Sequence, residues 1–308
     1  MLEVDSTTSH ETSEPLPFPF NQQTFCRYEP IEKRVEQIRV LVIDDLLRDK
    51  SDLSELALTE WGRSADSHLQ REREIAGMAL RNILNNVERL VKRPTTHVAH
   101  VSEIAEAAAE FSPDAIVLSG TLRDFDYYNP DILTNFNRFV HSTHIPVLGI
   151  CGGHQLIGLS FNSRIETLDH REPHERRVDR PFEYQYRFIR ITQPDDPIFA
   201  GINDRDGGVW QEYTTQARIL RVWQNHGLQL DRVPEGFQLL ATSYLCRNQM
   251  MVRRAEEQLI YAVQFHLEKS FEDWHKNRTR WEHPNESRDG RIIFENFLFE
   301  SLKHNAKV

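Results

Sequence analysis

Residues 145–160 have the sequence Ile-Pro-Val-Leu-Gly-Ile-Cys-Gly-Gly-His-Gln-Leu-Ile-Gly-Leu-Ser. The short apolar run from Val147 to Ile150 is typical of a strand, and the pattern that begins at Gln155 is typical of a helix. Cys151 is therefore predicted at a sharp strand-to-helix turn, where the helix dipole and free backbone N–H groups favour a thiolate. A buried core cysteine beside a glycine-rich loop is the alternative that this stretch alone leaves open.

Strands and helices alternate ahead of this turn. The patterns predict strands at residues 38–43, 96–101, 114–118 and 147–150, and helices at 72–92, 102–111 and 131–141. Such alternation predicts an α/β fold in which a parallel sheet has helices on both faces. Ligands of these sheets bind at the carboxyl ends of the strands. Ser119-Gly120-Thr121 and Cys151 both follow predicted strands, so we expect them at that edge.

The second half of the chain has a different pattern. Strand-like segments occur near Ile165 and at residues 184–191, 218–224, 238–242 and 260–265, with turns between them. They predict a small antiparallel extension of the sheet. Residues 291–302 have an amphipathic pattern that predicts a closing helix against the core.

One domain is expected from residue 38 to residue 308. Residues 1–37 are rich in Ser, Thr, Glu and Pro without a clear period, which predicts a flexible N-terminal arm. Residues 46–93 are long for one crossover between strands, so we expect a helical insert there. This insert is expected either to pack on the sheet or to dock a partner protein.

The composition argues against several classes of protein. The net charge of −10 leaves no strong positive field to attract the phosphates of a nucleic acid. No apolar run approaches the length of a membrane span, and Met1 to Pro19 lack the pattern of a secretory signal. Three cysteines, Cys26, Cys151 and Cys246, are too few for a disulfide framework. We expect a cytoplasmic protein that binds neither nucleic acid nor membrane.

A base for Cys151 is predicted within Gln264-Phe-His266-Leu-Glu268. Alternate side chains of an extended segment share a face, so Glu268 can orient His266 while the second imidazole nitrogen faces Cys151. Taken alone, His-x-Glu is more typical of a solvated strand end. The pairing gains weight only beside the glycine-flanked cysteine.

Together these motifs resemble those of the class I (triad) glutamine amidotransferases. The resemblance rests on Gly149-Ile-Cys-Gly-Gly-His-Gln155 and on residues 264–268, and Ala115-Ile-Val-Leu-Ser-Gly120 is similar to the strand and oxyanion loop of that family. Gln224-Asn-His-Gly227 is most similar to the small subunit of carbamoyl phosphate synthetase. The similarity extends from about Ile38 to the closing helix and implies a mostly parallel, flavodoxin-like twisted sheet.

The resemblance implies a chemistry for three of these residues. Cys151 would attack the side-chain amide carbon of glutamine and form a γ-glutamyl thioester. His266 would carry the proton to ammonia and then activate water, while Glu268 orients it. The resemblance places the oxyanion and the amino-acid end of the substrate at backbone and side-chain groups of Gly120, Thr121, Gly152, Gln155, Asn225, Gly227 and Leu228.

Two positions depart from the family pattern. Thr121 stands where the family usually has a second glycine, so a positive φ there would be costly and the loop would be reshaped. Leu267 replaces the usual proline, which matters little to the triad. No cofactor and no metal are expected, and we interpret the charged loop that holds His170 and His174 as solvated.

The acceptor of the ammonia is left open. The chain has no Gly-x-x-x-x-Gly-Lys-[Ser/Thr] loop and no second large domain, so a partner synthetase on another chain is expected to use the ammonia. The alternative is a hydrolase of γ-glutamyl amides or peptides that acts alone. A second alternative is a non-catalytic binding module, against which the intact triad argues.

Overall fold

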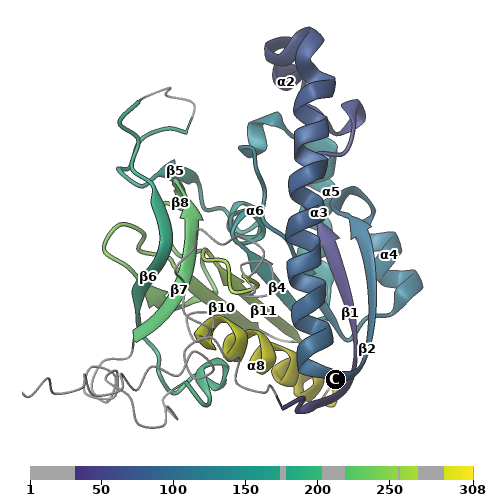
Figure 1. The fold of residues 1–308 in the computed structure, drawn as a ribbon, viewed down its shortest axis with the longest axis vertical. Helices are drawn as coiled ribbons and strands as arrows, with labels where there is room; N and C mark the ends of the chain where they lie inside the picture. The colour runs from purple at the N-terminus through teal and green to yellow at the C-terminus, as the bar shows by residue number, and fades with distance from the viewer. Residues whose placement is uncertain (1–31, 174–177, 203–218, 256, 270–287, 308) are drawn as a thin grey trace, which may run out of the picture.

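The fold is built on one large mixed sheet in the computed structural model (Figure 1). The structure describes residues 32–173, 178–202, 219–255, 257–269 and 288–307. The predicted arm therefore lies mostly outside the described residues. Its last three residues, 35–37, already belong to the first strand, so the described sheet begins earlier than the sequence pattern indicates.

Five strands at one side of the sheet are parallel neighbours. In spatial order they are β2 (Val91–His100), β1 (Val35–Asp44), β3 (Ala115–Leu118), β4 (Val147–Ile150) and β11 (Gln258–Val263). Within this group Val147 of β4 is paired with Ile116 on one side and Ile260 on the other. The carboxyl ends of β3, β4 and β11 consequently meet at one edge.

Antiparallel strands continue the sheet beyond β11. They are β10 (Met250–Ala255), β9 (Gln238–Thr242), β6 (Glu183–Ile191) and β7 (Ile219–His226). A separate two-stranded sheet contains β5 (Ile165–Thr167) and β8 (Leu228–Leu230). The mostly parallel sheet with an antiparallel extension is confirmed, although the sequence patterns predict neither β8 nor β10.

Helices cover both faces, as the alternation predicts. One face carries α3 (Ala65–Leu90) and α8 (Arg288–Asn305), and the other carries α4 (Ile104–Phe111), α5 (Pro130–Ser142) and α6 (Gly152–Ser160) (Figure 1). A hydrophobic core lies on each face of the sheet, and alternate residues of β1 pack into one or the other. Val40 and Val42 pack on the α3 side, and Leu41 and Ile43 pack on the α5 side. No helix within the described ranges combines the length and apolarity needed to cross a bilayer.

The segment predicted as an insert, residues 46–93, contains the crossover helix between β1 and β2. Ile83, Val87 and Leu90 of α3 are buried in the core that β1 and α8 share. The helix begins at Ala65, before the predicted start at residue 72. Its first turns lie against the preceding α2 (Glu55–Trp61), where the rings of Trp61 and His68 are 4.7 Å apart and Leu69 belongs to the same core as Trp61. Short 3-10 turns complete the connections at Lys50–Asp52, Gly62–Ser64, Val101–Glu103, Phe125–Tyr127 and Pro197–Phe199. A docking role for the insert stays a prediction.

Strand β2 begins at Val91, whereas the sequence pattern predicts a strand only from residue 96. The reason is the partner strand, because β1 pairs with β2 from Val35↔Val91 onward. β2 is an edge strand, so Lys92 and Arg93 remain exposed and Pro94 is tolerated. Polar residues that look like a loop are thus drawn into the sheet by backbone pairing.

Phe297→Ala is expected to lower the free energy of unfolding by about 3–5 kcal/mol. The Phe297 side chain is fully buried in α8 and meets Tyr261 edge-on, with ring centroids 6.2 Å apart. Leu58→Ala is the control, because Leu58 is 43% exposed and its truncation is expected to cost about 0.5 kcal/mol or less. Urea titration followed by circular dichroism measures both costs. Equal values would contradict the packing role of Phe297.

Candidate active site

Cys151 lies at the turn between β4 and α6, with φ 51° and ψ −99°. Positive φ is uncommon for a residue other than glycine and costs about 1–3 kcal/mol, which surrounding contacts must offset. The next residue has to be glycine, because a Cβ on Gly152 would lie 2.4 Å from the backbone nitrogen of Thr121. The sequence prediction of a sharp strand-to-helix turn agrees with this geometry. Cys151 itself is only 7% exposed.

Backbone hydrogen bonds connect this turn to both neighbouring strands. The Cys151 N–H donates to the carbonyl of Val263 at 2.8 Å, and the Gly153 N–H donates to the carbonyl of Ser119 at 3.1 Å. The loop of Ser119, Gly120 and Thr121 is thereby held against the start of α6. Thr121 is not among the described non-glycine residues with positive φ, so the strain anticipated for a β-branched residue there does not arise.

His266 and Glu268 follow β11 and form a hydrogen-bonded pair. The His266 N–H donates to the carbonyl of Trp223 at 2.8 Å, which anchors the backbone beside β7. The ring Nδ1 lies 2.7 Å from Glu268 Oε1, so Nδ1 donates and Nε2 is left for another partner. A Cβ on Gly120 would lie 3.4 Å from His266 Cε1 and 3.6 Å from Cys151 Cβ. The imidazole and the cysteine therefore lie beside the same glycine.

The pKa of His266 is raised to about 10. Burial by itself lowers this pKa, because it disfavours the imidazolium. The negative charge on Glu268 and the charge and hydrogen bonding of Cys151 outweigh burial. His266 is consequently held as an imidazolium between an acid partner and a cysteine.

The other predicted site residues lie around the β7–β8 connection and the start of α6. Asn225 is exposed at the end of β7, and Leu228 begins β8. Gly227 is covered by an aromatic ring, because a Cβ there would meet Phe182 Cδ2 at 3.0 Å. Gln155 is almost buried, and its Nε2 donates to Gln264 Oε1 at 3.1 Å and to the Leu228 carbonyl at 3.4 Å. The Nε2 group of Gln155 therefore donates its hydrogen bonds to acceptors of the protein itself.

Several neighbours of this site have no role in the sequence-based prediction. Gln264 Nε2 lies 3.6 Å from Cys151 Sγ. Because Gln264 directly precedes Phe265 and His266 in the motif, its position in the sequence indicates that it lies near the site. Asn86 of α3 donates to the backbone carbonyl of Glu268 at 2.7 Å. A residue separated so far in sequence from Glu268 carries no local signal. The insert helix therefore braces the segment that holds the His266–Glu268 pair.

Histidines outside the pair have other surroundings. Burial lowers the pKa of His154 to about 3, so this fully buried residue of the cysteine motif is neutral. His170 pairs with Glu166 at 2.6 Å on the surface, and His174 lies outside the described residues. Across the part of the chain that the structure describes, no group of three His, Cys, Asp or Glu side chains is arranged to hold a metal ion.

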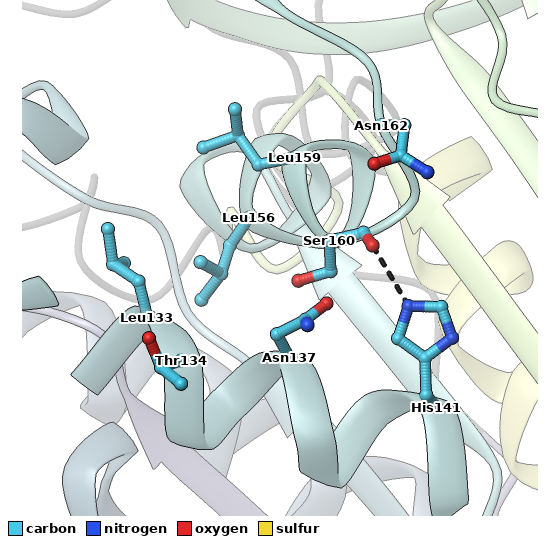
Figure 2. A pocket seen from close by; sticks show the side chains of 8 residues that line it. All are labelled: Leu133, Thr134, Asn137, His141, Leu156, Leu159, Ser160 and Asn162. Carbon is cyan, nitrogen blue, oxygen red and sulfur yellow. Dashed lines mark hydrogen bonds between the residues drawn. The ribbon is translucent and has the colours of Figure 1, made fainter. Parts of the chain in front are cut away.

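A separate groove lies between α5 and α6 (Figure 2). Its volume is about 520 Å³, and Leu133, Leu156 and Leu159 provide apolar lining. His141 closes one end, where its Nε2 bonds to the Ser160 carbonyl at 2.9 Å. None of the predicted site residues lines this groove, so we do not assign the catalytic chemistry to it.

Glu268→Gln is expected to reduce stability most near pH 6 and progressively less as the pH approaches 10. The folded-state pKa of His266, about 10, lies above the ordinary value of 6.5, so the stability from its charge is complete below pH 6.5. That stability is lost as the pH rises through about 10, and a neutral amide removes the share that Glu268 contributes. Urea midpoints of both proteins at pH 6, 8 and 10 measure the difference. A difference that stays constant over this range would contradict the charge pairing.

Comparison with known proteins supports the same family that the motifs indicate. The family model of class-I glutamine amidotransferases matches residues 79–281, more than half of the chain. A glutamine-hydrolyzing GMP synthase of Actinobacillus pleuropneumoniae is 32% identical over 168 residues, which cover 53% of this chain and 27% of that protein. The glutamine-hydrolyzing GMP synthase of Haemophilus influenzae Rd is 30% identical over 164 residues, with 52% and 26% covered. The chain thus matches about a quarter of the length of these curated relatives.

The fold also has a counterpart among solved structures. A Thermoplasma acidophilum protein, described as a candidate component of GMP synthase, aligns with a TM-score of 0.52 and 20% identity, covering 87% of this chain and 96% of that chain. At this identity the likeness concerns the fold alone. Because the family model covers more than half of the chain, the protein belongs to the class-I glutamine amidotransferases.

Proposed function

We propose that this protein hydrolyses the side-chain amide of glutamine through a thioester on Cys151 and passes the ammonia to a partner synthetase. The observation that carries the proposal is His266, whose ring bonds to Glu268 and lies with Cys151 beside Gly120. A cysteine, an imidazole and an orienting carboxylate are the three groups that acyl transfer to a thiol requires. Family membership supports glutamine as the donor.

In the first half of the reaction, the Cys151 thiolate forms a bond to the amide carbon. The carbonyl electron pair moves onto oxygen, and the backbone N–H groups of Gly152 and Thr121 are proposed to stabilise it, at about 3–4 kcal/mol per donor. When the C–N bond breaks, the His266 imidazolium gives its Nε2 proton to the departing nitrogen. Ammonia leaves, and the γ-glutamyl thioester remains on Cys151.

In the second half, His266 acts as a base. The thioester has no negative charge on sulfur, so the contribution of Cys151 to the raised pKa of His266 is lost. The neutral imidazole can then take a proton from water, whose oxygen attacks the thioester carbon. The C–S bond breaks, glutamate leaves, and the proton on His266 and the charge on Cys151 return to their starting places. Glu268 orients the ring throughout and holds no proton itself.

The relatives bear on the use of the ammonia. The relatives are named as glutamine-hydrolyzing synthases and are much longer than their match to this chain. This supports delivery of ammonia to a synthetase, which we propose as a partner protein.

We also propose a reducing, cytoplasmic setting for the protein. The two described cysteines, Cys151 and Cys246, are free and buried, which supports that setting.

A second candidate function is hydrolysis of larger γ-glutamyl amides or peptides. Two exposed aromatic residues near Gly227 favour this candidate. Phe182, which lies beside Gly227, is 54% exposed, and Tyr184 is 41% exposed. Their rings lie 6.4 Å apart. Exposed rings at the edge of a polar site suit a substrate with an apolar part, which free glutamine lacks.

A substrate panel distinguishes the two functions. The purified protein is given glutamine, γ-glutamyl dipeptides and γ-glutamyl anilides, and kcat/KM is recorded for each. We expect glutamine hydrolysis that is slow alone and faster when a native extract is added. A preference of more than about tenfold for the larger amides would favour the second candidate, and Phe182→Ala should then reduce that preference. Silence toward every substrate, with and without extract, would favour the non-catalytic binding module.

The proposed roles predict an order of severity among variants. Cys151→Ala is expected to abolish turnover, and His266→Ala to reduce kcat by about 10³-fold or more. Glu268→Gln should reduce kcat by about 10²-fold, because His266 can still carry the proton but loses the carboxylate that orients it. Steady-state glutamate release measures all three, with circular dichroism to confirm folding. A Glu268→Gln enzyme with the wild-type rate across the pH range would contradict the orienting role.

A further inference from the structure

A buried glutamine faces the sulfur of Cys151. Gln264 directly follows β11 and is fully buried, and its Nε2 lies 3.6 Å from Cys151 Sγ. This is within the range of an N–H donor to sulfur, whose larger radius lengthens the contact relative to an oxygen acceptor. Its identity as nitrogen rather than oxygen decides whether the contact attracts or repels a thiolate, so the orientation of the amide has to be argued from its partners.

The neighbouring bonds determine that orientation. The Leu228 carbonyl can only accept, so the Gln155 atom that points to it must be the NH₂ nitrogen. The same Gln155 nitrogen lies 3.1 Å from Gln264 Oε1, which must therefore accept. The other end of the Gln264 amide is then its NH₂ group, and this group points to Cys151.

A second set of buried groups holds the Leu228 carbonyl in place. His226 Nδ1 lies 2.9 Å from this carbonyl and donates to it. His226 Nε2 lies 3.0 Å from Gln224 Oε1 and 3.0 Å from Glu183 Oε2. Gln249 closes the network, since its Nε2 donates to Glu183 at 2.8 Å and its Oε1 accepts from Gln224 at 2.9 Å. Each amide in this network has one consistent orientation, which makes the arrangement rigid.

We propose that Gln264 is a further catalytic residue, which donates a hydrogen bond to the Cys151 thiolate while Gln155 and the Leu228 carbonyl hold its amide in that orientation. The inference rests on Cys151 being the nucleophile of the proposed function. A hydrogen bond to an ionised acceptor in a water-poor site is stronger than one between neutral groups. His266 supplies the positive charge beside the sulfur, and Gln264 supplies a neutral donor on it.

The role of Gln264 in the reaction is electrostatic. It keeps its own protons in every step. Attack of the thiolate on the amide carbon removes the negative charge from sulfur, and the hydrogen bond weakens. When water attacks the thioester, the C–S bond breaks and the charge returns to sulfur, where the Gln264 amide stabilises it. The donor therefore favours the resting thiolate and its departure in the second half.

The test measures the reactivity of the Cys151 thiol in the absence of glutamine. Cys151 in the full chain is alkylated with iodoacetamide from pH 5 to pH 10, and its modification is followed by mass spectrometry of the peptide that contains it. Three proteins are compared with the wild type: Gln264→Met, which keeps the volume without a donor, Gln264→Glu, which places a carboxylate against the sulfur, and the control Gln258→Glu. Gln258 lies at the opposite end of β11, where its Nε2 donates to the His141 carbonyl at 3.0 Å.

Loss of the donor in Gln264→Met should raise, by about one unit, the pH at which alkylation reaches half of its maximal rate. The slowing should be confined to the acidic part of the profile, where the thiolate forms. Gln264→Glu should raise that pH further, because an ionised carboxylate repels the thiolate. The control should keep the wild-type profile. The other ionisable groups near the sulfur, His266 and the more distant Cys246, are unchanged in all four proteins. The variants isolate Gln264 for that reason.

A wild-type profile in either folded Gln264 variant would overturn the inference. If Gln264→Met does not fold, the Gln264→Glu profile decides alone. Because iodoacetamide reports on the thiol and not on turnover, a protein without glutaminase activity can still support the inference. Conversely, an active glutaminase whose Gln264 variants keep the wild-type profile refutes it and leaves the proposed function intact.

Discussion

Parallel pairing of β4 with β3 on one side and β11 on the other is the constraint on which the site depends. Val147 is paired with both Ile116 and Ile260, so the three strands end at the same edge of the sheet. That edge then receives the loop at Thr121, the turn at Cys151 and the segment of His266. A shift of one residue in either pairing would turn every side chain of the strand to the opposite face and separate these groups.

The close approach of backbones at this edge limits which residues can stand there. Gly152 lies so near Thr121 that no side chain fits between them, and Cys151 has to accept a positive φ. Bonds from the Cys151 and Gly153 N–H groups to neighbouring carbonyls hold this conformation. The strain is local, and the buried sheet around it offsets the cost.

Buried charge in the site is compensated in pairs. His266 with Glu268 and His226 with Glu183 each place an imidazole against a carboxylate. The side chains of His226, Glu183 and Glu268 are almost buried, and that of His266 is 18% exposed. Leaving one partner buried alone would be costly, because a charge without a counter-charge or hydrogen bonds is strongly disfavoured in a protein interior. Gln249 donates a further hydrogen bond to Glu183, whereas Glu268 Oε2 is buried without a hydrogen-bond partner among the residues that the structure describes. A chain of hydrogen bonds runs from His226 through the Leu228 carbonyl, Gln155 and Gln264 to the sulfur of Cys151.

The sequence by itself determined the family, the alternation of strands and helices, and the turn at Cys151. It could do so because apolar periodicity and glycine-flanked turns are local patterns. It also placed His266 and Glu268 within hydrogen-bonding reach, since alternation over three residues is local as well. The extent of β2, by contrast, followed from pairing with β1, because its polar residues carry no strand signal of their own. Only the tertiary structure brought Asn86 and Glu183 to the site and placed the Gln264 amide against the sulfur of Cys151. Their contacts join segments far apart in the chain, and such contacts are decided by strand order and by the hydrogen-bonding demands of buried polar groups.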